Sequence, residues 1–99
     1  MALHRVRDQD RLDGASNFTV YKAKILSVLD RNRVKNFTLK VIAISVDPND
    51  NDKYEEAMAK AKSIILNGVK DHVVPHIVEK ETAYDMWETL KKLYQRTYV

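Results

Sequence analysis

The sequence predicts an all-α fold, a small orthogonal helical bundle of about four helices. Three stretches place apolar residues three or four positions apart, which is the spacing of one face of an α-helix. The chain has 99 residues, which is enough for a single domain with one hydrophobic core. Its composition, 44% hydrophobic and 31% charged, is typical of a globular protein. We divide it into an N-terminal arm, residues 1–11, and a helical domain, residues 12–99.

The first helix is predicted over residues 18–32. Two favoured N-cap residues, Ser16 and Asn17, come directly before it. Basic residues follow at its C-terminal end, where positive charge complements the helix dipole. The apolar stripe consists of Phe18, Tyr21, Ile25, Val28 and Leu29, and the basic residues are Arg31, Arg33 and Lys35.

A stretch rich in β-branched residues, 37–46, has the propensity of a strand. A single strand in a helical chain has no obvious partner, so three interpretations stay open. In the first, the stretch and the N-terminal arm form a short β segment, an edge hairpin. In the second, the stretch pairs with a strand of another molecule. In the third, it is a helix despite its strand propensity. The Asp- and Asn-rich residues 47–52 then predict a turn.

The second half of the chain predicts two further helices and a short apolar segment. Residues 53–67 form the second helix, and Gly68 is placed to end it. Residues 71–78, interrupted by Pro75, predict a single helical turn or a loop inserted into the core. The last helix, 83–96, starts at a capping box and has the most regular stripe. The two stripes are Tyr54, Met58, Ala61, Ile65 and Val69, and Ala83, Met86, Trp87, Leu90, Leu93 and Tyr94.

Catalytic and metal-binding patterns are weak in this sequence. There is no cysteine, so disulfides, zinc knuckles and cysteine nucleophiles are excluded from this chain. The two glycines, Gly14 and Gly68, cannot form a glycine-rich phosphate loop. His72 and His76 have the spacing of metal ligands on a helix, but Pro75 interrupts that helix and no third ligand is near. We therefore expect no enzyme activity, no metal, no cofactor and no small-molecule substrate.

Membrane association is not expected either. No run of apolar residues approaches the length of a membrane span, and the N-terminus lacks the apolar core of a signal peptide. These features predict no membrane partner and are compatible with a cytoplasmic location.

Charge is divided unevenly along the chain. Residues 1–46 carry nine Lys and Arg against four Asp and Glu, a net +5, whereas residues 47–99 carry eight against ten, a net −2. A basic half can contact a phosphate backbone, or it can meet the acidic half of another copy head to tail. Trp87 and Tyr94 could stack on bases, but their place on the apolar stripe favours core packing. The candidate nucleic-acid or inter-subunit contacts are Arg5, Arg7, Arg11, Arg31, Arg33 and Lys35.

Two motifs resemble those of one known family. Residues 12–22, Leu-Asp-Gly-Ala-Ser-Asn-Phe-Thr-Val-Tyr-Lys, resemble a Leu-Asp-Gly-Ser-Asn-Tyr-x-x-Trp-Lys opening. Residues 82–94 resemble a Thr-Ala-x-x-x-Trp-x-x-Leu-x-x-x-Tyr helix. Both belong to the Gag polyproteins of copia-type LTR retrotransposons, in the N-terminal region of the capsid. The chain departs from this pattern at the extra residue Ala15 and at Tyr21, where the family usually has Trp.

The resemblance covers about residues 11–95 and implies a role. It implies a structural capsid domain that self-assembles into an intracellular, virus-like particle around the element's RNA. The expected partners are copies of the chain itself, the isolated domain being a monomer or dimer, with weak RNA contact. The alternatives are a basic nucleic-acid-binding domain, or a host-domesticated Gag-derived protein-interaction domain of the same fold. The end of the chain, soon after the last helix, suggests an excised domain. The family-motif core is Leu12, Phe18, Tyr21, Ile25, Ile65, Met86, Trp87, Leu90 and Tyr94.

Overall fold

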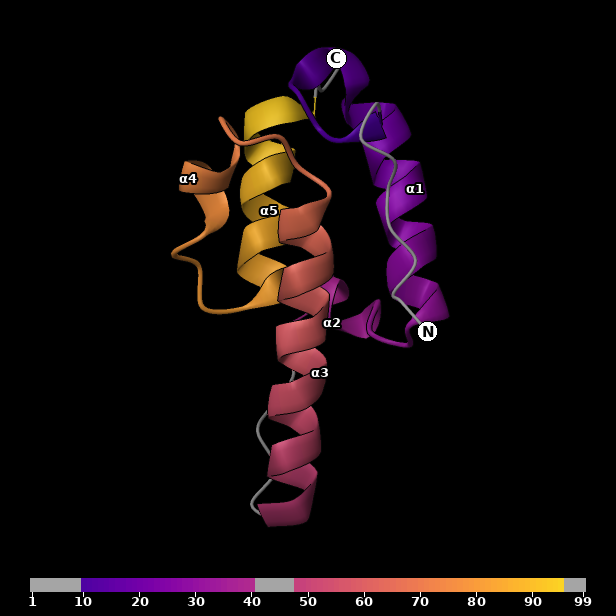
Figure 1. The fold of residues 1–99 in the computed structure, drawn as a ribbon, viewed down its shortest axis with the longest axis vertical. Helices are drawn as coiled ribbons and strands as arrows, with labels where there is room; N and C mark the ends of the chain where they lie inside the picture. Colours follow the sequence, from indigo (N-terminus) through magenta and orange to yellow (C-terminus); the bar gives the residue numbers. More distant parts are fainter. Residues whose placement is uncertain (1–9, 41–47, 96–99) are drawn as a thin grey trace.

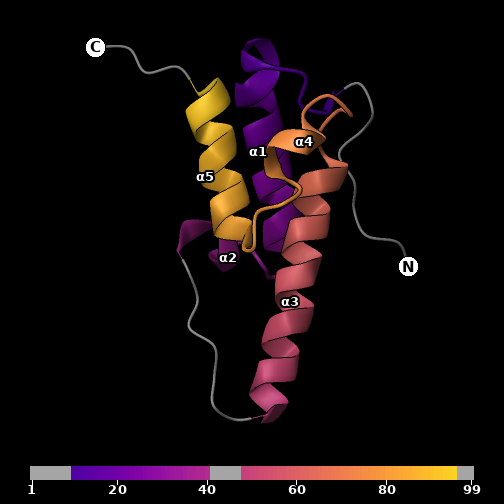
Figure 2. The same ribbon diagram turned by 90° about the vertical axis from the view of Figure 1, so that its left-hand side faces the viewer.

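The computed structural model of the chain describes residues 10–40 and 48–95. Its three longer helices are α1 (Phe18–Arg31), α3 (Pro48–Asn67) and α5 (Ala83–Tyr94). Their axes are roughly aligned in both views, with α1 antiparallel to α3 and α5 (Figures 1 and 2). Shorter elements connect them. These are the 3-10 helix η2 (Ala15–Asn17) and the one-turn helices α2 (Asn36–Leu39) and α4 (Val74–Ile77).

The all-α prediction is confirmed, with five α-helices in the described residues where about four were expected. The long helices are more nearly aligned than the orthogonal arrangement that the sequence predicted (Figure 2). One isolated β-bridge, between Leu12 and Val69, is the sole β pairing in the part of the chain that the structure describes. None of the helices in that part is long and apolar enough to cross a membrane.

Of the three interpretations left open for 37–46, the helix holds for residues 37–39, which belong to α2 and not to the strand that their propensity favours, while residues 41–46 lie outside the described residues. Side-chain contacts explain why a helical turn forms despite the β-branched sequence. The Thr38 hydroxyl is buried and donates to the Lys35 carbonyl oxygen at 2.7 Å. The Phe37 ring packs against Tyr54 of α3 with 5.7 Å between ring centroids. Tertiary packing therefore overrides local propensity in α2.

Helix α1 confirms the predicted element to within one residue, and its predicted stripe is buried. Its C-terminal end is a Schellman motif. The Val34 N–H donates to the Leu29 carbonyl at 3.0 Å, and the Arg33 N–H donates to the Asp30 carbonyl at 3.0 Å. Val34 and Leu29 are both buried, which supplies the apolar contact that accompanies this motif. Arg33 adopts a φ of 61°, in the left-handed region that favours glycine.

Replacing Arg33 by glycine should therefore stabilise the domain. Relief of the left-handed strain contributes about 1–2 kcal/mol, and the greater freedom of glycine in the unfolded chain offsets about 0.4–1 kcal/mol of it. We expect a net gain of about 0.5–1 kcal/mol in the free energy of unfolding, measured by urea denaturation. Arg33→Ala removes the same charge but keeps the Cβ atom, and should not gain. A less stable Arg33→Gly variant would contradict this account of the turn.

Helix α3 begins earlier than predicted. The sequence predicted a turn at 47–52 and a helix from residue 53, whereas α3 spans Pro48–Asn67. Proline is well suited to the first helical position because it lacks the N–H that has no partner there. Asp50 lies in the first turn, where a negative charge is favoured by the helix dipole. The residues that resembled a turn are thus the start of a helix.

The predicted elements after α3 are confirmed. Of the two forms predicted around Pro75, a helical turn or an inserted loop, α4 is the helical turn, and Ile77 anchors it in the core. Helix α5 starts at Thr82, whose hydroxyl accepts a hydrogen bond from the Asp85 N–H at 3.0 Å. This is the expected half of a capping box. The buried side of α5 comprises Ala83, Met86, Trp87 and Leu90. The prediction is wrong in two details: Leu93, placed on this stripe, is 46% exposed, and the helix ends at Tyr94 and not at residue 96.

An aromatic cluster links α1 to α5 at the centre of the core. Trp87 is 3% exposed, and its ring centroid lies 6.5 Å from that of Phe18 and 6.0 Å from that of Tyr21. Gly68, just after α3, lies against this cluster. A Cβ atom on Gly68 would lie 2.8 Å from Ile25 Cδ1 and 3.0 Å from Tyr21 Cε1. Glycine is therefore required here for close packing, rather than for the unusual backbone conformation that ends many helices.

Burial raises the pKa of the Tyr21 phenol well above its ordinary value of about 10. Its hydroxyl donates a long hydrogen bond, 3.4 Å, to the Ile65 carbonyl. The pKa of this phenol is therefore higher in the folded state than in the unfolded chain. Its contribution to the free energy of unfolding is complete below about pH 10, and it is lost as the pH rises further.

Tyr21→Phe should therefore cost at most about 1 kcal/mol at neutral pH, since the bond it removes is long. Above about pH 10 the wild-type chain should lose stability faster than the variant, so that the gap between them narrows. Urea denaturation of both proteins at neutral and alkaline pH measures this difference. Parallel losses in the two proteins would mean that Tyr21 does not titrate on unfolding.

Candidate interaction surface

The motif residues predicted as a core lie inside the fold. Every one of them is buried except Tyr94, which is partly buried and packs against the core. Trp87 in particular has almost no exposed surface for stacking on a base. Any contact with another molecule must therefore come from other residues.

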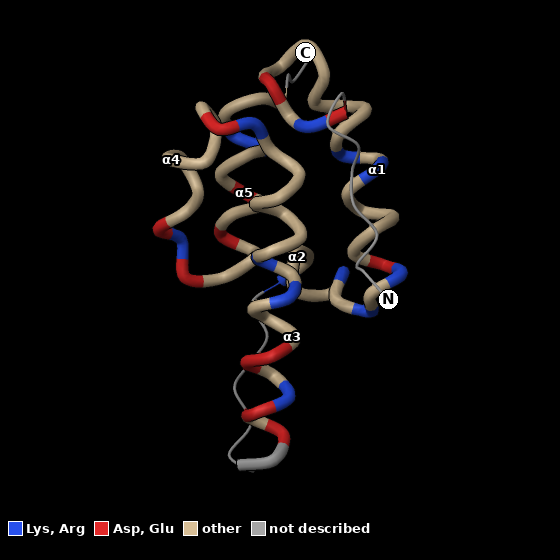
Figure 3. Tube along the Cα trace, viewed as in Figure 1, with Lys and Arg blue, Asp and Glu red and all other residues tan. Residues whose placement is uncertain are grey.

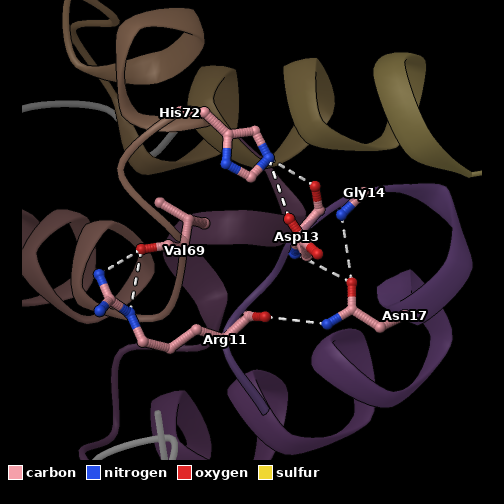
Figure 4. Close-up of polar contacts among 6 residues, drawn as sticks. All are labelled: Arg11, Asp13, Gly14, Asn17, Val69 and His72. Carbon is pink, nitrogen blue, oxygen red and sulfur yellow. Dashed lines mark hydrogen bonds and ion pairs between the residues drawn. The ribbon is translucent and has the colours of Figure 1, made fainter. Parts of the chain in front are cut away.

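Residues 11–17 form a clamp onto the segment after α3 (Figure 4). The backbone of Leu12 forms two hydrogen bonds with this segment. Its N–H donates to the Gly68 carbonyl oxygen at 2.8 Å, and its carbonyl oxygen accepts from the Lys70 N–H at 2.9 Å. The Arg11 guanidinium donates to the Val69 carbonyl from Nε at 3.1 Å and from Nη2 at 2.6 Å. Arg11, predicted as a contact residue, is thus directed onto this chain's own backbone.

Asn17 completes the clamp in a way that its N-cap prediction did not anticipate. It occupies the N-cap position of α1 but makes no side-chain cap bond to that helix. Its Oδ1 instead accepts from the N–H groups of Asp13 and Gly14 at 3.0 and 3.2 Å, and its Nδ2 donates to the Arg11 carbonyl at 2.8 Å (Figure 4). The amide therefore orders the preceding loop, which explains physically why asparagine suits this motif.

His72 contacts the same clamp. Its Nε2 is 3.2 Å from the Asp13 carboxylate and 2.7 Å from the Asp13 carbonyl oxygen (Figure 4). Across residues 10–40 and 48–95, no group of three His, Cys, Asp or Glu side chains could hold a metal ion.

The remaining predicted contact residues divide into two sets. Arg5 and Arg7 lie outside the described residues. Arg31 and Arg33 are exposed at the end of α1, and Lys35 is partly exposed at the start of α2. We define residues 30–40 as the basic corner. It carries Arg31, Arg33, Lys35 and Lys40 against Asp30, a net +3.

A second charged surface was missed by the sequence analysis. The N-terminal half of α3 extends beyond the other helices (Figure 1), and we define residues 50–56 as the acidic arm. It carries four acidic residues and one lysine, a net −3, and all five of these side chains are exposed. The signal was the proline followed by acidic residues, which is typical of a helix start as well as of a turn. The acidic residues are Asp50, Asp52, Glu55 and Glu56, and the lysine is Lys53.

The basic corner and the acidic arm are not joined to other charged groups within residues 10–40 and 48–95. None of their charged side chains forms an ion pair or a side-chain hydrogen bond in the part of the chain that the structure describes. Leu39, on α2 within the basic corner, is 60% exposed, the most exposed of the large hydrophobic residues that are described. This end of the molecule therefore offers charge of both signs and apolar surface to an external partner.

Comparison with known proteins gives one family. The family described as gag-polypeptide of LTR copia-type matches residues 18–99, a range that starts at the first residue of α1 and includes every α-helix of the fold. No curated protein and no solved structure gives a significant match.

Proposed function

This chain belongs to the gag polypeptides of copia-type LTR retrotransposons, and we propose that it is the module through which copies of such a polypeptide assemble into a particle. The family match carries the proposal, because it covers the complete set of α-helices rather than a single motif. The particle would be intracellular and would enclose the element's RNA.

The distribution of residues supports a structural role. The motif residues that resemble the family are devoted to the core and not to a pocket. Exposed charged side chains that form no ion pair among the described residues include those of the basic corner and the acidic arm. A rigid core with charged contact surfaces is what a repeating assembly requires, since each copy must present the same geometry to its neighbours.

Sedimentation of a gag polypeptide that contains this sequence tests the proposal. We expect particles much larger than any small oligomer, visible by electron microscopy and dependent on salt. Trp87→Ala, which disrupts the core, should abolish them, and Trp87→Phe should largely preserve them. A wild-type polypeptide that remains a small species at every salt concentration would refute the proposed function.

Direct RNA binding is the second candidate function, and the unpaired basic corner is the observation that favours it. It predicts an affinity in the micromolar range that falls steeply with salt. Because Arg11 is part of the clamp, charge reversal at Arg31 and Arg33 is a cleaner test than reversal in the N-terminal arm. RNA binding that survives Arg31→Glu/Arg33→Glu would reject this role for the corner.

A further inference from the structure

The basic corner lies at the end of the helical bundle from which the acidic arm projects (Figure 3). Their net charges are equal and opposite, +3 and −3. The α2 and α3 helices meet where the Phe37 ring packs on Tyr54, so the two surfaces are joined by an apolar contact. Even so, no ion pair connects them within the described residues. Complementary charges that are close in the fold but unpaired within one copy are available to pair between copies.

We infer that a second copy of this chain binds at this end across a two-fold axis, with each acidic arm against the basic corner of the other copy. This inference rests on the proposed function and specifies its contact surface. In a two-fold contact each residue pair occurs twice, so both charged surfaces of both copies are matched in a single closed interface.

The fold favours this arrangement over the head-to-tail pairing that the uneven sequence charge suggested. Head-to-tail pairing places the arm of one copy on the corner of the next and leaves one arm and one corner unmatched in every dimer. A two-fold dimer leaves neither unmatched. The position of the basic corner at the base of the projecting arm, visible in Figure 3, brings both surfaces within reach of one partner copy.

The same arrangement argues against RNA as the main partner of this end. A phosphate backbone that approaches the basic corner also meets the acidic arm, whose net charge cancels that of the corner. A second copy is attracted by both surfaces, because its acidic arm complements the basic corner and its basic corner complements the acidic arm. Leu39 adds exposed apolar surface within the charged contact, which is the usual composition of an interface with a polar rim.

The contact should be weak in the isolated chain. The seven residues 50–56 of the acidic arm are about 10 Å long at a rise of 1.5 Å per residue, so we expect a contact area below the roughly 800 Å² per partner of a stable complex. We therefore expect dimers only at high concentration, from about 100 μM upward. Weak individual contacts are sufficient in a lattice, where many act together.

Charge exchange between two variants of the 99-residue chain tests the inference. The arm variant is Glu55→Lys/Glu56→Lys and the corner variant is Arg31→Glu/Arg33→Glu. Sedimentation velocity at low salt should show wild-type dimers, while each variant alone should have a dissociation constant raised at least about tenfold. A one-to-one mixture of the two variants should restore dimers, because each basic arm then faces an acidic corner.

A matched control changes the same charges elsewhere. Glu79→Lys/Glu81→Lys replaces two exposed acidic residues on the connection between α4 and α5, and it should dimerise like the wild type. Circular dichroism checks that each variant is folded. Salt supplies a second measurement without any substitution, since wild-type dimers should dissociate as the ionic strength rises.

Several results would overturn the proposed contact without overturning the proposed assembly function. A wild-type chain that stays monomeric up to about 1 mM, variants that dimerise like the wild type, or a mixture that grows beyond dimers would overturn the inference. So would a corner variant that loses binding to an RNA oligonucleotide while its dimerisation is unchanged. Gag polypeptides that form normal particles with either variant would overturn the inference alone and leave the assembly role intact.

Discussion

Replacing Trp87 by alanine should lower the free energy of unfolding by about 3–5 kcal/mol, the range measured for large-to-small changes in well-packed cores. Trp87 is 3% exposed, and its ring packs against the rings of Phe18 and Tyr21 on α1. Its loss removes the side chain that joins α5 to α1. A loss of this size is comparable to the whole stability of many small domains, so much of the variant should be unfolded.

Denaturation followed by circular dichroism measures this effect, because Trp87 is the single tryptophan and its fluorescence disappears with it. Leu93→Ala provides the control on the same helix. Leu93 is 46% exposed, so its replacement should cost less than about 1 kcal/mol. A loss below about 1 kcal/mol for Trp87→Ala would show that the aromatic cluster does not hold the helices together.

Gly68→Ala should destabilise the domain by about 1–3 kcal/mol, although alanine usually stabilises a chain relative to glycine. The added Cβ atom would lie 2.8 Å from Ile25 Cδ1, inside the core, so the packed side chains must move. Thermal or urea unfolding of the single variant gives the size of this clash.

A double variant identifies the clashing atom. Ile25→Val removes the Cδ1 atom itself and, alone, should cost about 0.5–1.5 kcal/mol. Combined with Gly68→Ala it should cost less than the sum of the two single changes, because the cavity accepts the new methyl group. Additive costs would mean that the strain lies elsewhere, for example against Tyr21.

The sequence predicted the helices with strong apolar periodicity and missed what depends on tertiary contacts. The stripes of α1 and α5 are long and regular, and both helices lie where they were predicted. Helix α2 is a single turn without periodicity, so the sequence left helix and strand open, and the burial of Thr38 and the packing of Phe37 on Tyr54 decide between them. Composition alone could not separate the start of α3 from a turn, because proline and aspartate favour both.

The contact surfaces were predicted only in part. Arg31, Arg33 and Lys35 were identified from their charge, and the structure leaves them at the surface. Arg11 was grouped with them, but its guanidinium binds the Val69 carbonyl across 58 residues of sequence, a contact that no local pattern announces. The acidic arm was hidden by the turn prediction, since a turn would not have placed its four carboxylates along one extended helix.

Cross-linking between copies tests the central claim most directly, because the chain contains no cysteine to interfere. Asp30→Cys in the basic corner and Lys53→Cys in the acidic arm remove the one opposing charge from each surface, so the complementary charges stay intact. A short bis-maleimide added to a mixture of the two variants should link corner to arm and yield mainly the mixed dimer. A mixture of Lys53→Cys and Glu79→Cys should link much more slowly. Equal rates in both mixtures would contradict the proposal that copies of this chain meet through these two surfaces.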